Sequence, residues 1–125
     1  MENDQIIKTT IKQADQHLFD AEEELCRPEE DVVPYMACRG AYKAVNHYLV
    51  GYLLKHGMEI NASMSLDFLL DTCRAIEPQF AELNLDPLYN TNIHEHDDVF
   101  MDMDTVKEFM GIASQTKILV KQLIN

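Results

Sequence analysis

The sequence has 125 residues, and the 46% of them that are hydrophobic indicate a globular protein and exclude an intrinsically disordered chain. The 22 acidic residues outnumber the 10 basic ones and give a formal net charge of −12, so direct binding of free DNA or RNA as the main ligand is not expected. A chain of this length fits a single domain that covers residues 1–125.

The first predicted element is a helix over about residues 4–26. Its apolar residues recur at spacings of three and four, which places them along one face of a helix. The residues of this seam are Ile7, Ile11, Ala14, Leu18, Ala21 and Leu25. Arg27 precedes Pro28, and a residue before proline avoids the helical conformation, so the helix is expected to end there.

A second helix is predicted from about Pro34 to His56. Proline suits the first turn of a helix because its missing N–H costs nothing there. This segment is apolar on more than one side, which is typical of a central helix with neighbours on several faces. Gly57 follows as the expected C-terminal cap.

Two more helices are predicted farther along the chain. Leucines dominate the apolar face of residues 65–76, and a short helical piece is expected after Pro78. Asp86-Pro87 is interpreted as a break. The last helix covers about residues 104–124, with Asp104-Thr105 and Glu108 as its capping arrangement. The chain has no extended strand pattern, so we expect an all-α fold, a four- to five-helix up-and-down bundle.

The N-terminal stretch MENDQIIKTT is polar and lacks the apolar core of a signal peptide. The longest apolar run, from Tyr48 to Leu54, is far too short to cross a bilayer. The three cysteines have no C-x-x-C spacing, which is typical of reduced thiols. We therefore expect a soluble, cytoplasmic protein without a membrane partner.

Four polar residues of the second helix share one side of it. Arg39, Lys43 and His47 are spaced four apart and Asn46 stands beside them, so we call these four residues the basic face. One interpretation is a ligand-binding site for an anion or the phosphate of a nucleotide. The alternative is an exposed helix edge that pairs with acidic side chains of the first helix.

Residues 90–99, NTNIHEHDDV, carry the densest group of potential metal ligands. His94, His96, Asp97 and Asp98 are all ligand types for zinc or manganese. The alternative is a solvated acidic connection near the N-terminus of the last helix, where negative charge is favourable. A metal site formed by His94, His96 and Asp98 therefore stays open, and no other cofactor is expected.

The stretch YMACRGAYKAVNHYLVGYLLKHGMEINASMSLDFLL resembles the HEPN family of small helical domains. The resemblance includes a long second helix rich in alanine and aromatic residues, its Lys55-His56-Gly57 end, a short loop and a leucine-rich third helix. The segment DTVKEFMGIASQTKILVKQLI looks like the closing helix of this family. The resemblance implies a helical bundle, and it implies a nucleotidyltransferase or antitoxin as partner.

Ribonucleases of this family carry an arginine followed after four to six residues by a histidine. The arginine holds a phosphate, and the histidine serves as acid or base. In this chain Asn90 and His94 fit the motif, but Tyr89 stands where the arginine belongs. A tyrosine supplies no permanent positive charge, so the resemblance implies a member without catalytic activity.

Three functions follow from the sequence. The first is a non-enzymatic binding module, in which the basic face engages a nucleotide-type anion or a nucleotidyltransferase partner. The second is a ribonuclease that uses His94 with Arg39 or Arg74 brought close by the fold. The third is a metal-binding helical bundle. We also expect a homodimer, because the last helix is broadly apolar and such proteins commonly pair through helices.

Overall fold

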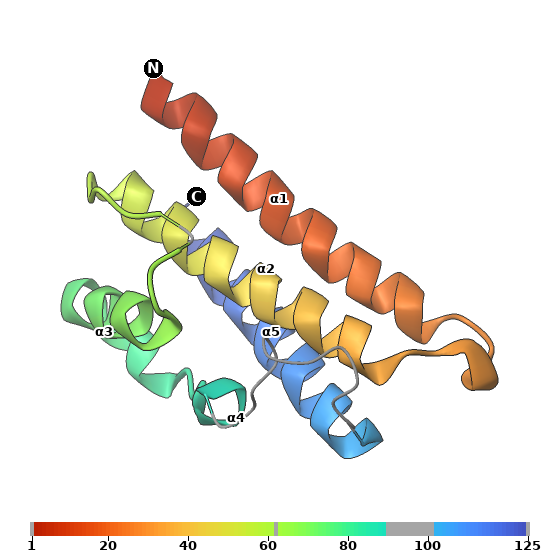
Figure 1. Ribbon diagram of the computed structural model, residues 1–125. Helices are drawn as coiled ribbons and strands as arrows, with labels where there is room; N and C mark the ends of the chain where they lie inside the picture. The colour runs from red at the N-terminus through yellow and green to blue at the C-terminus, as the bar shows by residue number, and fades with distance from the viewer. Residues whose placement is uncertain (1, 62, 90–101, 125) are drawn as a thin grey trace.

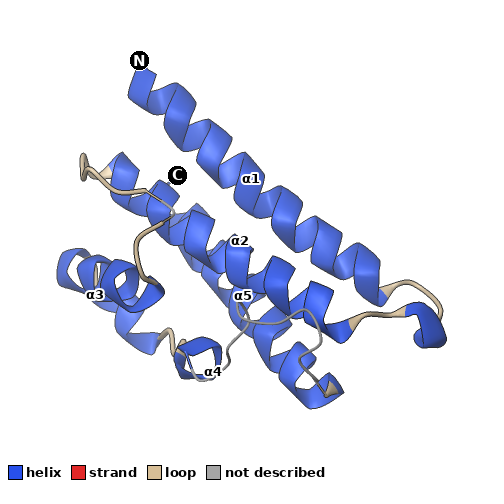
Figure 2. Ribbon diagram, viewed as in Figure 1, coloured by secondary structure: helices blue, strands red, loops and turns tan. Residues whose placement is uncertain are grey.

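The computed structural model describes residues 2–61, 63–89 and 102–124. The regular secondary structure of this part of the chain is all helical, without strands (Figures 1 and 2). The helices pack against one another, which confirms the predicted all-α bundle. The elements in chain order are α1 (Glu2–Leu25), the 3₁₀ turn η1 (Glu29–Asp31), α2 (Pro34–Lys55), α3 (Leu66–Ile76), the 3₁₀ turn η2 (Pro78–Glu82), α4 (Asp86–Tyr89) and α5 (Met103–Ile124).

The three long helices do not simply alternate in direction. α1 and α2 form an antiparallel pair, whereas α5 lies behind α2 and runs in the same direction (Figure 1). Met103 and Val106, at the start of α5, line one hollow together with Pro34, the first residue of α2. A parallel neighbour needs a connection that crosses back along the bundle, and the segment after α2 carries α3, η2 and α4 on its way.

The predicted helix limits are confirmed to within two residues, because each limit follows from local chemistry. Gly57 has a φ of 80°, the left-handed conformation that closes α2, and the N–H of Met58 donates to the Leu53 carbonyl at 3.1 Å. Two details differ. α4 begins where a break was predicted at Asp86, since a helix tolerates Pro87 in its first turn.

The second difference concerns the cap of α5. The sequence favoured Asp104-Thr105 with Glu108, but the carboxylate of Asp102 accepts the N–H of Thr105 at 2.7 Å. The Thr105 N–H and hydroxyl lower the pKa of the Asp102 carboxyl. The cap therefore lies two residues earlier than predicted, and Met103 is the first residue of the helix.

α2 is the centre of the bundle, as its apolar pattern predicted. Tyr48, Leu49 and Leu53 are completely buried, and they belong to one continuous core with Phe80 and Phe109. Full burial of each such side chain contributes roughly 1.5–3 kcal/mol to stability. α1 covers one side of α2, α5 covers another and α3 packs on a third (Figure 1).

One carboxylate joins the three long helices. The Tyr48 hydroxyl of α2 donates to the carboxylate of Asp15 in α1, and the Lys121 ammonium of α5 donates to its other oxygen at 2.9 Å. Burial and the bond to Asp15 both raise the pKa of Tyr48. These two interactions with Asp15 restrict the sliding of α1 and α5 along α2.

Gly40 lies where the backbone of α1 comes close to α2. A Cβ atom at this position would lie 3.0 Å from the His17 carbonyl oxygen and 3.0 Å from the Ala21 Cβ. The missing side chain thus lets the backbones of the two helices touch. Gly111 of α5 differs, because a Cβ there would meet nothing within 4 Å.

No helix in the described ranges is long and apolar enough to cross a membrane.

Exchanging Gly40 and Gly111 for alanine should change the free energy of unfolding in opposite directions. Gly111→Ala adds helix propensity without a clash and should stabilise the fold by roughly 0.5–1 kcal/mol. Gly40→Ala gains the same propensity but forces α1 away from α2, so a net loss of about 1 kcal/mol is expected. Urea denaturation of both variants measures the difference, and a stabilising Gly40→Ala would show that the helices are not in tight contact.

Candidate functional site

The basic face borders two adjoining hollows on the surface of the bundle. The α3-side hollow has a volume of about 450 Å³, and the α1-side hollow has a volume of about 380 Å³. Lys43 and His17 line both of them, so the two hollows share a wall. Arg39 lines only the α1-side hollow, whereas Asn46 and His47 line only the α3-side hollow. All four residues of the basic face therefore line concave surface.

His17 of α1 joins the basic face across the helix contact. Its imidazole ring lies 4.9 Å from the ring of His47, centroid to centroid, with the two planes tilted by 55°. His17 lies on the edge of the α1 seam, one turn before Ala21, at the point where Gly40 lets the backbones touch. The close approach of the helices thus brings two imidazoles from different helices together.

The hydrogen bond of His47 defines its tautomer. Nδ1 lies 2.8 Å from the backbone carbonyl oxygen of Lys43, one turn earlier in α2. A carbonyl oxygen only accepts, so Nδ1 carries the proton and donates it. The neutral ring therefore has its lone pair on Nε2, which is where an additional proton binds.

The surroundings of His17 disfavour its charged form. Burial lowers its pKa below 6.5, and the positive potential of His47 and Lys43 lowers it further. Asp20 acts in the opposite direction and raises it. Burial and the neighbouring positive groups therefore favour the neutral form of the His17 ring.

The sequence left open whether the basic face pairs with acidic side chains of the first helix. Within the described part of the chain, neither Arg39 nor Lys43 forms an ion pair. Glu24 lines the α1-side hollow, but its carboxylate binds Arg27 at 3.2 Å and accepts the N–H of Val33 at 2.9 Å. Asp20, the other α1 carboxylate that lines this hollow, accepts the side-chain amide of Gln16 at 2.8 Å.

Asn46 stands in the wall of the α3-side hollow with an unmet hydrogen-bonding group. Asn46 is only 7% exposed, and its Oδ1 has no hydrogen-bond partner among the residues that the structure describes. A buried polar atom without a partner costs about 1–3 kcal/mol, so such atoms are uncommon in structural positions. The position is therefore suited to a ligand or a bound water molecule.

The loop before α3 closes the other side of this hollow. The Asn61 side chain accepts the N–H of Ser63 at 2.9 Å and also the Ser63 hydroxyl, which gives the loop a fixed turn. The Ser65 hydroxyl and the Phe68 N–H lower the pKa of the Asp67 carboxyl. The start of α3 therefore has its own carboxylate as a cap.

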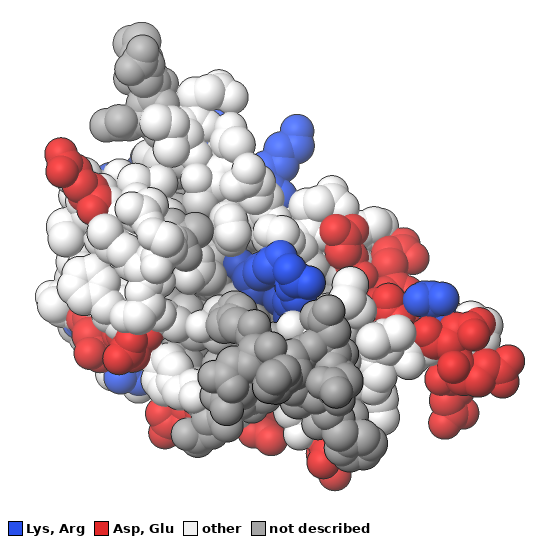
Figure 3. All heavy atoms as spheres, viewed as in Figure 1, with Lys and Arg blue, Asp and Glu red and all other residues white. Residues whose placement is uncertain are grey.

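Basic side chains lie over the middle of α2 in Figure 3, whereas acidic side chains gather around the end of α1 and η1. In a chain with a net charge of −12, this arrangement leaves a local positive region over the central helix.

His94, His96, Asp97 and Asp98, together with Asn90, lie outside the described residues, so the predicted metal site and the histidine of the ribonuclease motif stay predictions. Among the side chains of residues 4–61, 63–89 and 102–124, no three of the types His, Cys, Asp and Glu lie close enough together to hold a metal ion.

Tyr89 occupies the place of the arginine in the ribonuclease motif, and its surroundings are acidic. Burial is the main cause that raises the pKa of Tyr89 to about 12. The carboxylates of Asp67, Asp71 and Asp86 raise this pKa further, whereas Arg74 lowers it. Carboxylates around a hydroxyl repel an RNA phosphate, so this position does not favour an RNA substrate.

Arg74, one of the two cations considered for the ribonuclease, has a structural role. Its guanidinium donates to the backbone carbonyls of Phe80 at 3.3 Å and Leu83 at 2.7 Å. These bonds tie α3 to the turn η2 and to the residue that follows it. Arg39, the other candidate, lines the α1-side hollow.

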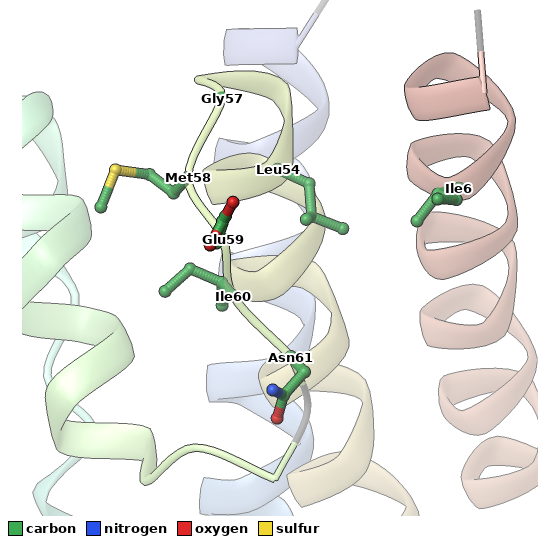
Figure 4. A pocket seen from close by; sticks show the side chains of 7 residues that line it. All are labelled: Ile6, Leu54, Gly57, Met58, Glu59, Ile60 and Asn61. Atoms are coloured by element: carbon green, nitrogen blue, oxygen red, sulfur yellow. The ribbon is translucent and has the colours of Figure 1, made fainter.

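A larger hollow of about 540 Å³ lies between α1, the end of α2 and the following loop (Figure 4). Ile6 and Leu54 face each other across it, and Glu59 is the charged residue among those drawn. Its described lining contains no Lys, Arg or His, so it does not suit an anion. An apolar hollow of about 670 Å³ lies where α1 and α5 meet the linker, with Lys107 and Arg27 at its edge.

Comparisons with protein-family models, with curated proteins and with solved structures found no match. The resemblance to the HEPN family therefore stays a prediction.

Sequence reasoning found the basic face but missed His17 and the loop residues Ser63 and Met64. The signal for His17 was present, because a residue three positions after Ala14 and four before Ala21 borders the seam of the first helix. Which part of the second helix it faces depends on the register of the two helices, and one sequence does not give that register.

The lowered pKa of His17 should be visible by NMR titration of the imidazole protons. Lys43→Met removes a neighbouring positive charge and should raise the pKa of His17. Lys55→Met removes the same charge about 18 Å farther along α2 and should leave that value nearly unchanged. Equal changes of the His17 pKa in both variants would show that this pKa depends only on the net charge of the protein. Because the folded state disfavours the protonated ring, His17 should also reduce stability as the pH falls below 6.5.

Proposed function

We propose that this protein is a non-enzymatic binding module that takes up a nucleotide-type anion at its basic face. Arg39, Lys43, Asn46 and His47 carry the binding, and His17 joins them from α1. The observation that supports this most is that Arg39 and Lys43 line concave surface without an ion pair in the described part of the chain. Unpaired basic side chains beside a hollow are available to a ligand charge.

The size and lining of the α3-side hollow suit a nucleotide. Its volume of about 450 Å³ lies within the range of roughly 300–1,000 Å³ that is usual for small-molecule sites. Met64 and the ring of Tyr42 supply apolar wall, while Lys43 supplies positive charge. The amide of Asn46 supplies a polar group with an unmet hydrogen bond. A flat heterocycle with a phosphate matches this combination.

A binding role also fits the state of the hydroxyl groups in this hollow. Ser63 donates to the side chain of Asn61, and the Ser65 hydroxyl lowers the pKa of the Asp67 carboxyl. Neither serine has a histidine as its partner in these contacts, which is what activation as a nucleophile needs. The alternative occupant of the same surface is a nucleotidyltransferase partner, and a homodimer remains part of the proposal.

Calorimetric titration with AMP at low ionic strength tests the proposal. AMP should bind, and Lys43→Ala should weaken binding by roughly 10-fold to 100-fold, since a charged hydrogen bond contributes about 1.5–3 kcal/mol. Arg39→Ala should weaken it less, because Arg39 lines only the neighbouring hollow.

The matched control is Lys55→Ala, which removes one positive charge from the same helix but lies in neither hollow. It should bind AMP like the unchanged protein. If AMP does not bind, or if Lys43→Ala and Lys55→Ala behave alike, the basic face is not an anion site.

A further inference from the structure

We infer that His17 and His47 together select a phosphate with two negative charges over a singly charged diester. A doubly charged phosphate is, for example, the monoester of a nucleoside monophosphate. The selection arises because the imidazole pair takes up one proton when the dianion binds. This inference rests on the proposed function and adds the class of ligand and the residue from α1 that recognises it.

The two imidazoles form one unit that holds a single extra proton. Their ring centroids are 4.9 Å apart, so two protonated rings would repel each other at short range. Lys43 lines the same wall and adds to that repulsion. The close contact of the two rings therefore disfavours a second proton, and a single added proton is the one that a nearby anion stabilises.

The position of that proton follows from the hydrogen bond of His47. Nδ1 of His47 donates to the Lys43 carbonyl, so the ring gains a proton at Nε2 and then donates there as well. His17 shares the wall between the hollows and offers the second site for the same proton. The phosphate thus meets a donor from α1 or from α2 beside the ammonium of Lys43.

Charge balance separates the two kinds of phosphate. A diester carries one negative charge, which Lys43 alone can balance. A monoester is mostly a dianion above its second pKa of about 6, so one charge remains after Lys43 is paired. A proton on the imidazole pair balances that remaining charge, and the dianion raises the affinity of the pair for the proton.

The other charged groups do not offer the same balance. In the α1-side hollow, Asp20 and Glu24 oppose Arg39, so a dianion is disfavoured there. The α3-side hollow carries no carboxylate among its described lining residues, although Asp67 caps the nearby start of α3. The groups that face the imidazole pair are Asp20 and Glu24 from α1, Arg39, Tyr42 and Lys43 from α2, and Asp67 beside Ser65 at the start of α3.

AMP and cyclic AMP test the inference, since they share base and sugar but carry a monoester and a diester. Titration calorimetry at about pH 7.5, in two buffers of different ionisation enthalpy, counts the protons taken up on binding, and this count should approach about one for AMP and about zero for cyclic AMP. Between about pH 7 and pH 8, the affinity for AMP should fall by up to about tenfold while that for cyclic AMP stays nearly constant.

Variants assign the proton to the pair. A single His17→Gln change leaves His47 to take the proton, so it should weaken AMP binding but retain part of the pH dependence. The double change His17→Gln with His47→Gln should abolish proton uptake and bring the affinities for AMP and cyclic AMP close together. The far-ultraviolet circular dichroism and thermal unfolding of each variant report whether the fold is kept.

The outcomes distinguish a failure of the imidazole inference from a failure of the proposed anion site. Binding of both nucleotides that depends on Lys43, with equal affinity and without proton uptake, would overturn the imidazole inference and keep the anion site. Proton uptake that persists in the double variant would overturn it too. Failure of both nucleotides to bind the unchanged protein would overturn the proposed function and this inference together.

Discussion

The contact between α1 and α2 determines most of what this protein places at its surface. Gly40 lacks the Cβ that would press on the His17 carbonyl and on Ala21, so the two backbones meet directly. That approach brings the ring of His17 to His47, and farther along it brings the carboxylate of Asp15 to the hydroxyl of Tyr48. One steric condition thus builds both the core of the bundle and the wall between the two hollows.

Although the chain has a net charge of −12, Arg39 and Lys43 form no ion pair within the described residues, and the contacts of α1 show where its carboxylates are engaged instead. Of the α1 carboxylates that face α2, the one of Asp15 is taken by Tyr48 and Lys121. The one of Glu24 is taken by Arg27 and by the backbone of the linker. Asp20 also lines the α1-side hollow and accepts the side-chain amide of Gln16, so in the described residues none of these three carboxylates pairs with Arg39 or Lys43.

Helix limits were predictable because they depend on local chemistry, namely apolar periodicity, Pro34 at a start and Gly57 at an end. The basic face was predictable for the same reason, since its residues share one helix. His17 was not, because its place depends on the register between two helices. The parallel course of α2 and α5 was missed because the sequence does not tell how the segment between them crosses the bundle.

The comparison of Tyr89 with Lys43 gives the physical reason for favouring binding over RNA cleavage. Tyr89 stands where the resemblance places a phosphate-holding arginine, yet burial raises the pKa of its hydroxyl, and the carboxylates of Asp67, Asp71 and Asp86 raise it further while Arg74 lowers it. Lys43 lies on α2, beside the imidazoles of His17 and His47 and the amide of Asn46. The α3-side hollow that it lines has no carboxylate among its described lining residues. The carboxylates near Tyr89 disfavour a phosphate there, whereas Lys43 lies beside a hollow without carboxylates among its described lining, and this difference in charge supports the proposal of an anion site on α2 over RNA cleavage.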